Sequence, residues 1–294
     1  MNKKNILNKK SIFIILIFFA LYIMSCNSGN KNVLLLDVGI CTDYTNGEIL
    51  AATGCDYIEE SVGHFLAPSK SEEEFNLILE HAKRSAVPVK AFNLFIPGSL
   101  KSVGPEAVHP VILKYAETAF RRSQKAGVKY IVFGSGGSRS IPDGFSRDEA
   151  RKQFVNLCTS MAPIAGKYNV VVVLEPLNKT ECNFINSVAE GGEIVKEVNH
   201  PNLRLLADIY HMLMDNESPQ NIVKYGDLIK HTHIAEKEGR AAPGIHNEDF
   251  KPYFAALKKI NYKGMMSVEC NWDNMESQAQ ASIATIKKQV DMLK

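Results

Sequence analysis

Val170-Val171-Val172-Val173-Leu174-Glu175 is an unbroken apolar run that ends in a carboxylate. A run of this length predicts a strand, and an apolar strand without alternation is typical of a parallel sheet covered on both faces. Three later runs end in the same way: 203–207 before Asp208, 228–231 before His233, and 264–268 before Glu269. Helical stretches separate the runs, so in a parallel barrel their carboxyl ends meet at one rim.

The rest of the chain extends this pattern to eight strand–helix units. The predicted strands are 33–38, 57–60, 89–94, 130–133, 170–174, 203–207, 228–233 and 264–268. The predicted helices are 46–52, 72–85, 105–126, 146–168, 187–198, 219–225, 249–259 and 277–293. Strand then helix, repeated eight times, predicts an α/β fold: one (β/α)₈ TIM barrel over residues 33–294. The alternative, an open doubly wound sheet, needs a glycine-rich phosphate turn that Val38-Gly39-Ile40-Cys41 does not supply.

The first 25 residues have the features of a secretory signal. Four lysines precede residue 11, and residues 11–23 are apolar but too few for a stable membrane span, which needs about 20 residues. Met24-Ser25-Cys26 resembles the lipobox of bacterial lipoproteins, which implies cleavage before Cys26 and lipid attachment to it. Residues 26–32 form a polar tether. The expected location is the bacterial cell envelope, as a lipid-anchored periplasmic or outer-membrane protein. An uncleaved membrane anchor is the alternative.

Charge and cysteine content narrow the function further. Without residues 1–25, which hold four lysines and no acidic residue, the 34 basic and 32 acidic side chains become 30 and 32, a formal net charge of −2. Nucleic-acid-binding proteins carry a basic surface, so no nucleic-acid partner is expected. The five cysteines beyond Cys26 are odd in number and contain no CxxC pair, which argues against a disulfide framework.

The four residues at the strand ends form the candidate metal site. A carboxylate at the end of a buried strand needs a partner, so Glu175 and Glu269 bind either a cation or an arginine, and Asp208 either a cation or a helix N-terminus. His231 and His233 share one side of their strand. His233 lies nearer its end and is the predicted ligand, with His231 a satisfied interior residue. Together the four predict one divalent ion, Mn²⁺ first, with Co²⁺, Fe²⁺ or Mg²⁺ as alternatives.

Residues in the neighbouring loops are candidates for substrate binding. His211 follows Asp208 by three positions and either contacts a substrate or is a supporting or surface histidine. Glu236 and Arg240 lie just beyond His233, and Arg240 either holds a substrate oxygen or is a solvated loop charge. The glycine-rich stretch 134–139 lacks the Gly-Lys-Ser/Thr ending of a P-loop, so we interpret it as a rim loop that lets the backbone approach the site.

Several motifs resemble the sugar isomerase/epimerase superfamily with xylose isomerase-like barrels, which is grouped with endonuclease IV. They are Phe92-Asn93, Phe133-Gly134-Ser135-Gly136, Leu174-Glu175-Pro176-Leu177-Asn178, Asp208-Ile209-Tyr210-His211, His233-Ile234-Ala235-Glu236, Arg240-Ala241-Ala242-Pro243-Gly244 and Ser267-Val268-Glu269. The pattern is most similar to ketose 3-epimerases of the D-tagatose 3-epimerase type. The resemblance implies that Glu175, Asp208, His233 and Glu269 bind one metal, that the two glutamates act as acid and base, and that His211 and Arg240 contact the sugar. The stretch 233–240 is one residue longer than in those epimerases.

The expected reaction begins with abstraction of a proton next to a carbonyl, giving an ene-diolate that the cation stabilises. Glu175 and Glu269 lie three strands apart around the rim and flank a bound sugar from opposite sides. Proton return by the second glutamate gives an epimer, and return to the adjacent carbon by the first gives an aldose. Because the expected location is outside the cytoplasm, the expected substrate is a free, unphosphorylated ketose or keto-sugar.

Other functions remain open at this stage. An inosose or 3-keto-sugar dehydratase or lyase would use the same first step, and a non-catalytic sugar-binding lipoprotein would use the same fold. An endonuclease IV-like nuclease would need three metals, but the histidines at 81, 109 and 200 fall on helices or at the wrong strand ends. The sequence leaves the oligomeric state open, a homo-oligomer included.

Overall fold

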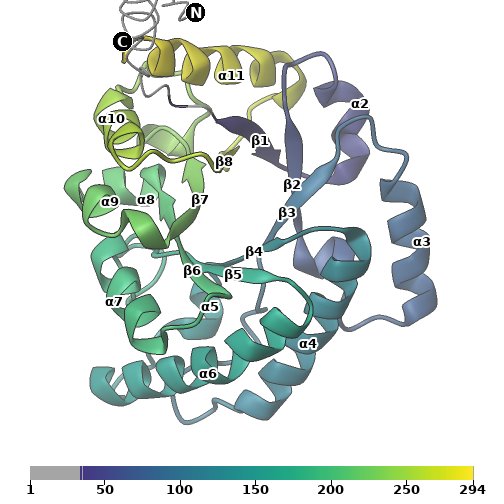
Figure 1. Ribbon diagram of the computed structural model, residues 1–294, viewed down its shortest axis with the longest axis vertical. Coiled ribbons are helices and arrows are strands. Elements are labelled where there is room, and N and C mark those ends of the chain that lie inside the picture. The colour runs from purple at the N-terminus through teal and green to yellow at the C-terminus, as the bar shows by residue number, and fades with distance from the viewer. Residues whose placement is uncertain (1–33, 35, 294) are drawn as a thin grey trace, which may run out of the picture. The chain divides into compact units, whose positions relative to one another are not determined.

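The protein forms a closed barrel of eight parallel strands in the order β1 to β8, surrounded by helices (Figure 1). The computed structural model describes residues 34 and 36–293. The predicted signal segment, Cys26 and the tether therefore lie outside the described residues. None of the helices within residues 36–293 is long and apolar enough to cross a membrane.

The strands are short, and each pairs in parallel with the next, β8 returning to β1. They are β1 Asp37–Cys41, β2 Tyr57–Ser61, β3 Val89–Asn93, β4 Tyr130–Phe133, β5 Val171–Leu174, β6 Leu203–Asp208, β7 Ile229–Ile234 and β8 Met265–Val268. The predicted single barrel is thereby confirmed. All carboxyl ends point to one rim, which places the residues after the strands around a common mouth.

Helices cover the outside of the ring. The main ones are α2 Gly47–Leu50, α3 Glu72–Ala82, α4 His109–Ala126, α6 Arg147–Lys167, α7 Val188–Val198, α9 Gln220–Lys224, α10 Lys251–Lys259 and α11 Met275–Asp291. Shorter segments follow strands at the mouth or join elements: α5 Gly136–Arg139, α8 Ile209–Met214, η1 Tyr44–Asn46, η2 Val62–Leu66, η3 Gly226–Leu228 and η4 Glu238–Arg240. The sequence did not predict these shorter segments.

Each predicted strand and helix is present, with bounds that shift by at most four residues. The largest shift is in β1, predicted from residue 33 and observed from Asp37. The bounds of β1 are set by its hydrogen-bonded pairing with β2 and β8 rather than by hydropathy, since Gly39 lies in register with Tyr57 of β2 and Ser267 of β8. Helix α4 begins at His109 rather than at residue 105 because Pro110 occupies its first turn, where a missing N–H is tolerated.

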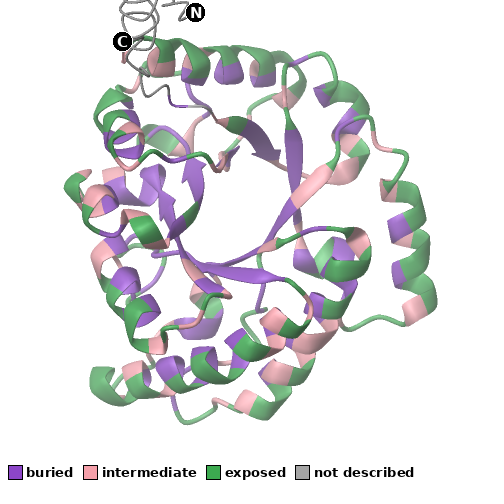
Figure 2. Cartoon of the chain, in the orientation of Figure 1, coloured by how far each residue is buried: buried purple, intermediate pink, exposed green. Residues whose placement is uncertain are grey.

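Burial divides the barrel interior into two unlike halves. Most strand residues around the ring are buried, and the intermediate or exposed ones lie mainly near the strand ends (Figure 2). Inside the barrel, an apolar cluster comes from β4, β5 and β6, with Val132, Val171, Val173 and Leu206 as its members. On the side of β2, β7 and β8, buried polar side chains take the place of the branched residues that ordinarily fill such a barrel. This polar half lies directly beneath the mouth.

Candidate metal centre and active site

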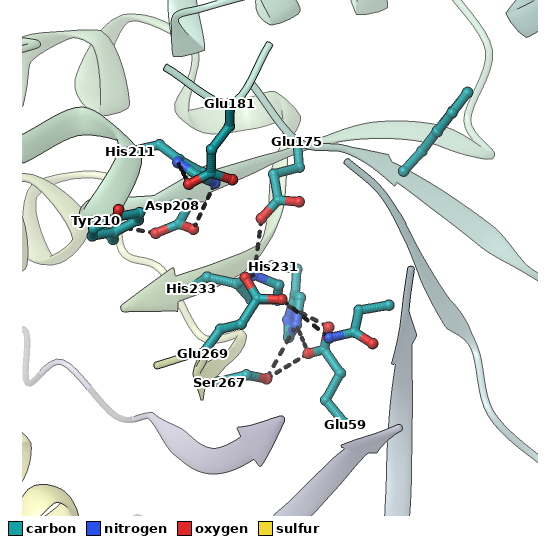
Figure 3. Close-up of polar contacts among 12 residues, drawn as sticks. Glu59, Glu175, Glu181, Asp208, Tyr210, His211, His231, His233, Ser267 and Glu269 are labelled. Carbon is teal, nitrogen blue, oxygen red and sulfur yellow. Dashed lines mark hydrogen bonds and ion pairs between the residues drawn. The ribbon is translucent and has the colours of Figure 1, made fainter. Parts of the chain in front are cut away.

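Strand alternation brings the four predicted ligands to the mouth. Glu175 follows β5 and Glu269 follows β8, whereas Asp208 and His233 lie near the carboxyl ends of β6 and β7. One potential ligand atom from each lies within 4.8 Å of those from the others. His233 Nδ1 is 2.9 Å from Glu175 Oε1 and 3.4 Å from Glu269 Oε2 (Figure 3). Three carboxylates and one imidazole thus face a common point.

Several of these atoms lack a hydrogen-bond partner. Glu175 Oε1, Asp208 Oδ2 and His233 Nδ1 are buried and have no hydrogen bond of good geometry among the described residues; their contacts are the ion-pair distances between His233 Nδ1 and Glu175 Oε1 and between His211 Nε2 and Asp208 Oδ2, 2.9 and 3.3 Å. Buried polar atoms are ordinarily paired, and a buried unpaired charge is costly. A divalent cation bound to these oxygen and nitrogen atoms would satisfy all three at once. The donor set therefore fits a metal ion of the Mn²⁺, Fe²⁺, Co²⁺ or Mg²⁺ type.

The electrostatics of the site also favour added positive charge. Burial lowers the pKa of His233, but the carboxylates of Glu59, Glu175 and Glu269 outweigh it and hold this pKa well above its usual range. Burial raises the pKa of Asp208 to about 6, although His233 and Arg240 oppose the shift. In the protein without metal, protons on these groups replace the charge that a cation would supply.

The two glutamates differ in their surroundings. Burial raises the pKa of Glu175 despite its contact with His233. Burial favours a raised pKa for Glu269 as well, but the charges of His233 and Arg240 lower this pKa to about 2. Glu269 receives hydrogen bonds from Asn93 Nδ2 at 3.2 Å and from Arg240 Nη2 at 2.5 Å. Unlike environments for two carboxyl groups are typical of an acid–base pair.

Arg240 and His211 line the outer part of the mouth, and their contact with a substrate stays a prediction. The Arg240 guanidinium lies over the Tyr210 ring at 4.6 Å and bridges Glu269 to Glu181, with its Nη1 3.4 Å from Glu181 Oε1. His211 Nδ1 lies 2.9 Å from Asn178 Nδ2. Because the Asn178 amide nitrogen is a donor, His211 carries its hydrogen on Nε2, which is buried and lies 3.3 Å from Asp208 Oδ2. Burial lowers the pKa of His211, so it is a neutral donor aimed at the site.

Glu181 is a site residue that the sequence reasoning missed. It lies in the loop between β5 and α7, and its Oε1 accepts from Asn178 Nδ2 at 3.0 Å as well as contacting Arg240. It lines the mouth cavity together with Glu175. The available signal was its position six residues after Glu175, within a loop that follows a ligand-bearing strand.

Glu236 has a different environment from the one expected of a substrate contact. Its side chain is fully buried, and its carboxylate accepts the backbone N–H groups of Gly244, His246 and Glu248. These bonds hold the loop that follows Arg240, and Glu236 is absent from the cavity lining. The substrate contact proposed for Glu236 stays a prediction, and the geometry favours a role in shaping this loop.

The mouth opens into a cavity of about 320 Å³, at the small end of the range for ligand pockets. One wall is apolar or glycine-rich, from Leu94 to Gly98 and from Ser135 to Gly137, and the other carries the charged residues. A Cβ added to Gly134 would lie 2.1 Å from Glu175 Oε2. This confirms the interpretation of the glycine-rich stretch as a rim loop whose backbone approaches the site.

Comparison of the sequence with models of protein families identifies the family of this chain. The family model for the xylose isomerase-like TIM barrel matches residues 48–293. The chain belongs to the xylose isomerase-like TIM barrel family. The resemblance inferred from the motifs is therefore confirmed.

Curated relatives in this family are named as sugar epimerases or isomerases. L-ribulose 3-epimerase of a Methylomonas species is 34% identical over 148 residues, which is 50% of this chain and 49% of the relative. 3-Dehydro-D-guloside 4-epimerase of Escherichia coli is 30% identical over 125 residues, 42% of this chain and 47% of the relative. The chain thus spans about half the length of these relatives.

Solved structures share the fold. D-psicose 3-epimerase determined in the presence of D-fructose superposes with a TM-score of 0.76 and 20% identity, covering 87% of this chain and 99% of that one. An IOLI protein with a bound zinc atom superposes with a TM-score of 0.67 and 21% identity, covering 86% and 96%. At these identities the likeness shows the barrel and no more.

Proposed function

We propose that this protein is a divalent-metal-dependent sugar isomerase or epimerase that acts on an unphosphorylated ketose or keto-sugar. The observation that carries the proposal is the convergence of Glu175, Asp208, His233 and Glu269, with three buried ligand atoms that have no hydrogen bond of good geometry among the described residues. The similarity to L-ribulose 3-epimerase and 3-dehydro-D-guloside 4-epimerase supports epimerisation as the reaction.

The chain's own residues divide the chemistry between them. A bound divalent cation would polarise the substrate carbonyl as a Lewis acid. Glu269, kept ionised by Arg240, removes the carbon-bound proton, and Glu175 faces the sugar from the other side of the mouth. Return of a proton from Glu175 inverts the carbon and gives the epimer. Return by Glu269 to the neighbouring carbon gives an aldose.

Residues at the outer part of the mouth orient the substrate. The Nε2–H of His211 donates to a sugar oxygen, and the Arg240 guanidinium holds a second oxygen while keeping Glu269 in place. Glu181 accepts from a sugar hydroxyl, since its carboxylate lines the same cavity. Withdrawing the sugar from water behind these groups favours the charged transition state.

The charge of the cavity supports an unphosphorylated substrate. Among the described residues that line it, the cation is Arg240, which already pairs with Glu269 and Glu181. Glu175, Glu181 and Glu269 surround the same space. With the cation bound to Glu175 and Glu269, a phosphate group at the outer part of the cavity would meet the Glu181 carboxylate and a guanidinium that is already paired, so the lining offers it no free cation.

The first test is metal content together with exchange in heavy water. Purified protein is expected to hold about one divalent ion per chain and to incorporate deuterium next to the carbonyl of an accepted ketose. Glu175→Gln and Glu269→Gln are each expected to lower kcat by about 10²- to 10⁴-fold, the usual range for a lost acid or base. Retention of activity by the double variant would contradict the mechanism, and release of water from the sugar would indicate a dehydratase.

For the N-terminal segment we propose export, cleavage before Cys26 and lipid attachment to that cysteine. The support is the pattern of four lysines, the apolar stretch 11–23 and the small residue before Cys26. The lipid would hold the barrel at a membrane of the cell envelope, where free sugars are available.

A further inference from the structure

The polar half of the barrel interior contains a carboxylate that the proposed mechanism does not use. Glu59 lies on β2, beneath the mouth, and is fully buried together with Tyr57, His231, His233 and Ser267. Burying a carboxylate among side chains is costly unless its lone pairs are filled. Packing alone does not account for such a residue, because the opposite half of the same interior is aliphatic.

The side chains of His231, His233 and Ser267 each donate a hydrogen bond to the Glu59 carboxylate (Figure 3). Its Oε1 is 2.9 Å from His233 Nε2, and its Oε2 is 2.6 Å from His231 Nε2. Ser267 Oγ donates to Oε2 at 2.5 Å. Tyr57 OH lies 2.7 Å from Ser267 Oγ and completes the chain of donors. Three donors from two other strands therefore fix the carboxylate.

The contact with His233 decides how that imidazole faces the mouth. A carboxylate only accepts hydrogen bonds, so the hydrogen of neutral His233 lies on Nε2. The lone pair is then on Nδ1, the atom that points at Glu175 and Glu269. Histidines that bind metals commonly donate their other ring N–H to a carboxylate, which fixes both tautomer and orientation.

We propose that Glu59 is the positioning residue of the metal centre: it holds His233 with Nδ1 toward the cation, and Tyr57, Ser267 and His231 hold Glu59. The inference rests on the metal site of the proposed function and extends it by one layer into the barrel. Glu59 touches neither sugar nor cation.

A competing role for Glu59 is that of a ligand. Atoms of Cys41, Glu59 and His233 also lie within 4.8 Å of one another, which is close enough for a second ion inside the barrel. Both oxygens of Glu59 already accept hydrogen bonds, however, and Nε2 of His233 is one of the donors. The geometry therefore favours positioning, and a second ion that is lost in Cys41→Ala would indicate a ligand instead.

The test measures Mn²⁺ affinity of the full-length protein by competition with a chelator. Glu59→Gln removes the charge at nearly constant shape and is expected to weaken Mn²⁺ binding by about 10- to 100-fold. Glu217→Gln is the control, because Glu217 is partly buried, accepts from the Asn221 side chain and the Val188 backbone N–H, and belongs to none of the groups of described residues close enough to hold a metal ion. The control is expected to bind Mn²⁺ within about threefold of the unaltered protein.

A second measurement needs no variant. Nitrogen-15 NMR of the unaltered protein loaded with Mg²⁺ or Zn²⁺, which are diamagnetic, is expected to show the His233 hydrogen on Nε2. A hydrogen on Nδ1, a second ion that is lost in Cys41→Ala, or a folded Glu59→Gln protein with unchanged Mn²⁺ affinity would each overturn the proposal. If Glu59→Gln does not fold, the NMR result decides.

The outcome is separable from that of the proposed function. Tight Mn²⁺ binding that depends on Glu59, in a protein that converts no ketose, would support positioning and contradict the isomerase. Conversion of a ketose by a protein whose Mn²⁺ affinity does not depend on Glu59 would support the isomerase and contradict the positioning role of Glu59. Absence of any divalent-ion binding by the unaltered protein would overturn both.

Discussion

At the scale of single residues, the site is defined by atoms that lack hydrogen-bond partners. Glu175 Oε1, Asp208 Oδ2, His233 Nδ1 and His211 Nε2 are buried, contact one another at ion-pair distances and have no hydrogen bond of good geometry among the described residues. Their neighbours are satisfied: Asn178 fixes His211, and Asn93 with Arg240 fixes Glu269. The neighbouring side chains therefore hold these groups in place while the atoms that face the mouth remain available to a ligand, which is the arrangement of a binding site.

Gly134 is predicted to be essential for the position of Glu175. A Cβ at residue 134 would lie 2.1 Å from Glu175 Oε2, and the carboxylate would have to turn away from the mouth. Gly134→Ala is therefore expected to lower kcat/KM by about 10²-fold, since displacing a reacting group by about 1 Å has effects of that size. The melting temperature should change little, because only the end of a side chain moves.

Gly63→Ala is the control for this prediction. Gly63 lies in another mouth loop, and its added Cβ would be 3.7 Å from Ser61 Oγ, an ordinary contact. Equal activity of the two variants in steady-state assays would contradict the argument.

Asp208 is predicted to make the metal-free protein less stable as pH rises. Its pKa is raised by burial to about 6 when folded, above the ordinary value of about 3.9 when unfolded, so the folded state binds the extra proton between these values. This contribution is fully present below pH 4 and is lost as pH rises through about 6, by on the order of 3 kcal/mol if Asp208 acts alone.

Urea unfolding of the metal-free protein between pH 4 and 7 checks this sign. Asp208→Asn cannot titrate and is expected to show a smaller fall in the free energy of unfolding over that range. Metal affinity of the unaltered protein should rise over the same range, because the ligand must lose its proton. A variant that follows the unaltered protein throughout would show that another group is responsible.

At the scale of elements, short segments after the strands set the mouth. The η4 segment carries Arg240, and the loop beyond it is held from within by Glu236. Arg240 adopts a left-handed backbone conformation with φ of 51°, which a side chain adopts only when its surroundings enforce it. The position of the guanidinium therefore depends on the whole loop.

Glu236→Ala is predicted to impair turnover through this loop. Three backbone N–H groups lose their acceptor, and each such bond to a charged group is worth about 1.5–3 kcal/mol. With Arg240 released, kcat/KM should fall by at least about tenfold, which corresponds to about 1.4 kcal/mol. Mn²⁺ affinity should remain within about threefold, since Glu236 contacts none of the four ligands.

Arg240→Lys provides the comparison for the loop variant, because it alters the guanidinium itself and leaves Glu236 and its hydrogen bonds in place. Similar kinetic losses in the two variants would support an effect through Arg240. Full activity of Glu236→Ala would show that the loop holds its shape without this carboxylate.

At the scale of the whole molecule, the chain enters the barrel on the face opposite the mouth. Strand β1 begins at Asp37, and the amino ends of all eight parallel strands lie on that face. Exposed Lys129, Lys230 and Lys263 lie at the amino ends of β4, β7 and β8. In the proposed lipoprotein, the tether joins the lipid on Cys26 to the strand that begins on this face.

The proposed lipid anchor can be checked by membrane fractionation. The unaltered protein is expected in the membrane fraction, and Cys26→Ser, which removes the proposed lipid attachment site, is expected in the soluble fraction. Equal distribution of the two proteins would contradict lipid attachment at Cys26.

The sequence by itself determined the barrel and the four residues at its mouth. Both follow from periodicity, because an apolar strand ending in a polar side chain can be read locally, and parallel closure sends all such ends to one rim. Bounds were less certain where pairing overrides hydropathy, as in β1.

Only the tertiary structure decided how the site is held. Glu59 and His233 are 174 residues apart, and Asn93 and Glu269 are 176 apart, so neither contact leaves a local pattern. Glu181 and Arg240 are 59 residues apart. The bonds of Glu236 span only 8 to 12 residues, but they lie within an irregular loop that has no periodic pattern. These positions depend on the register between distant strands and on the path of the connecting loops, which are set by packing of the whole barrel.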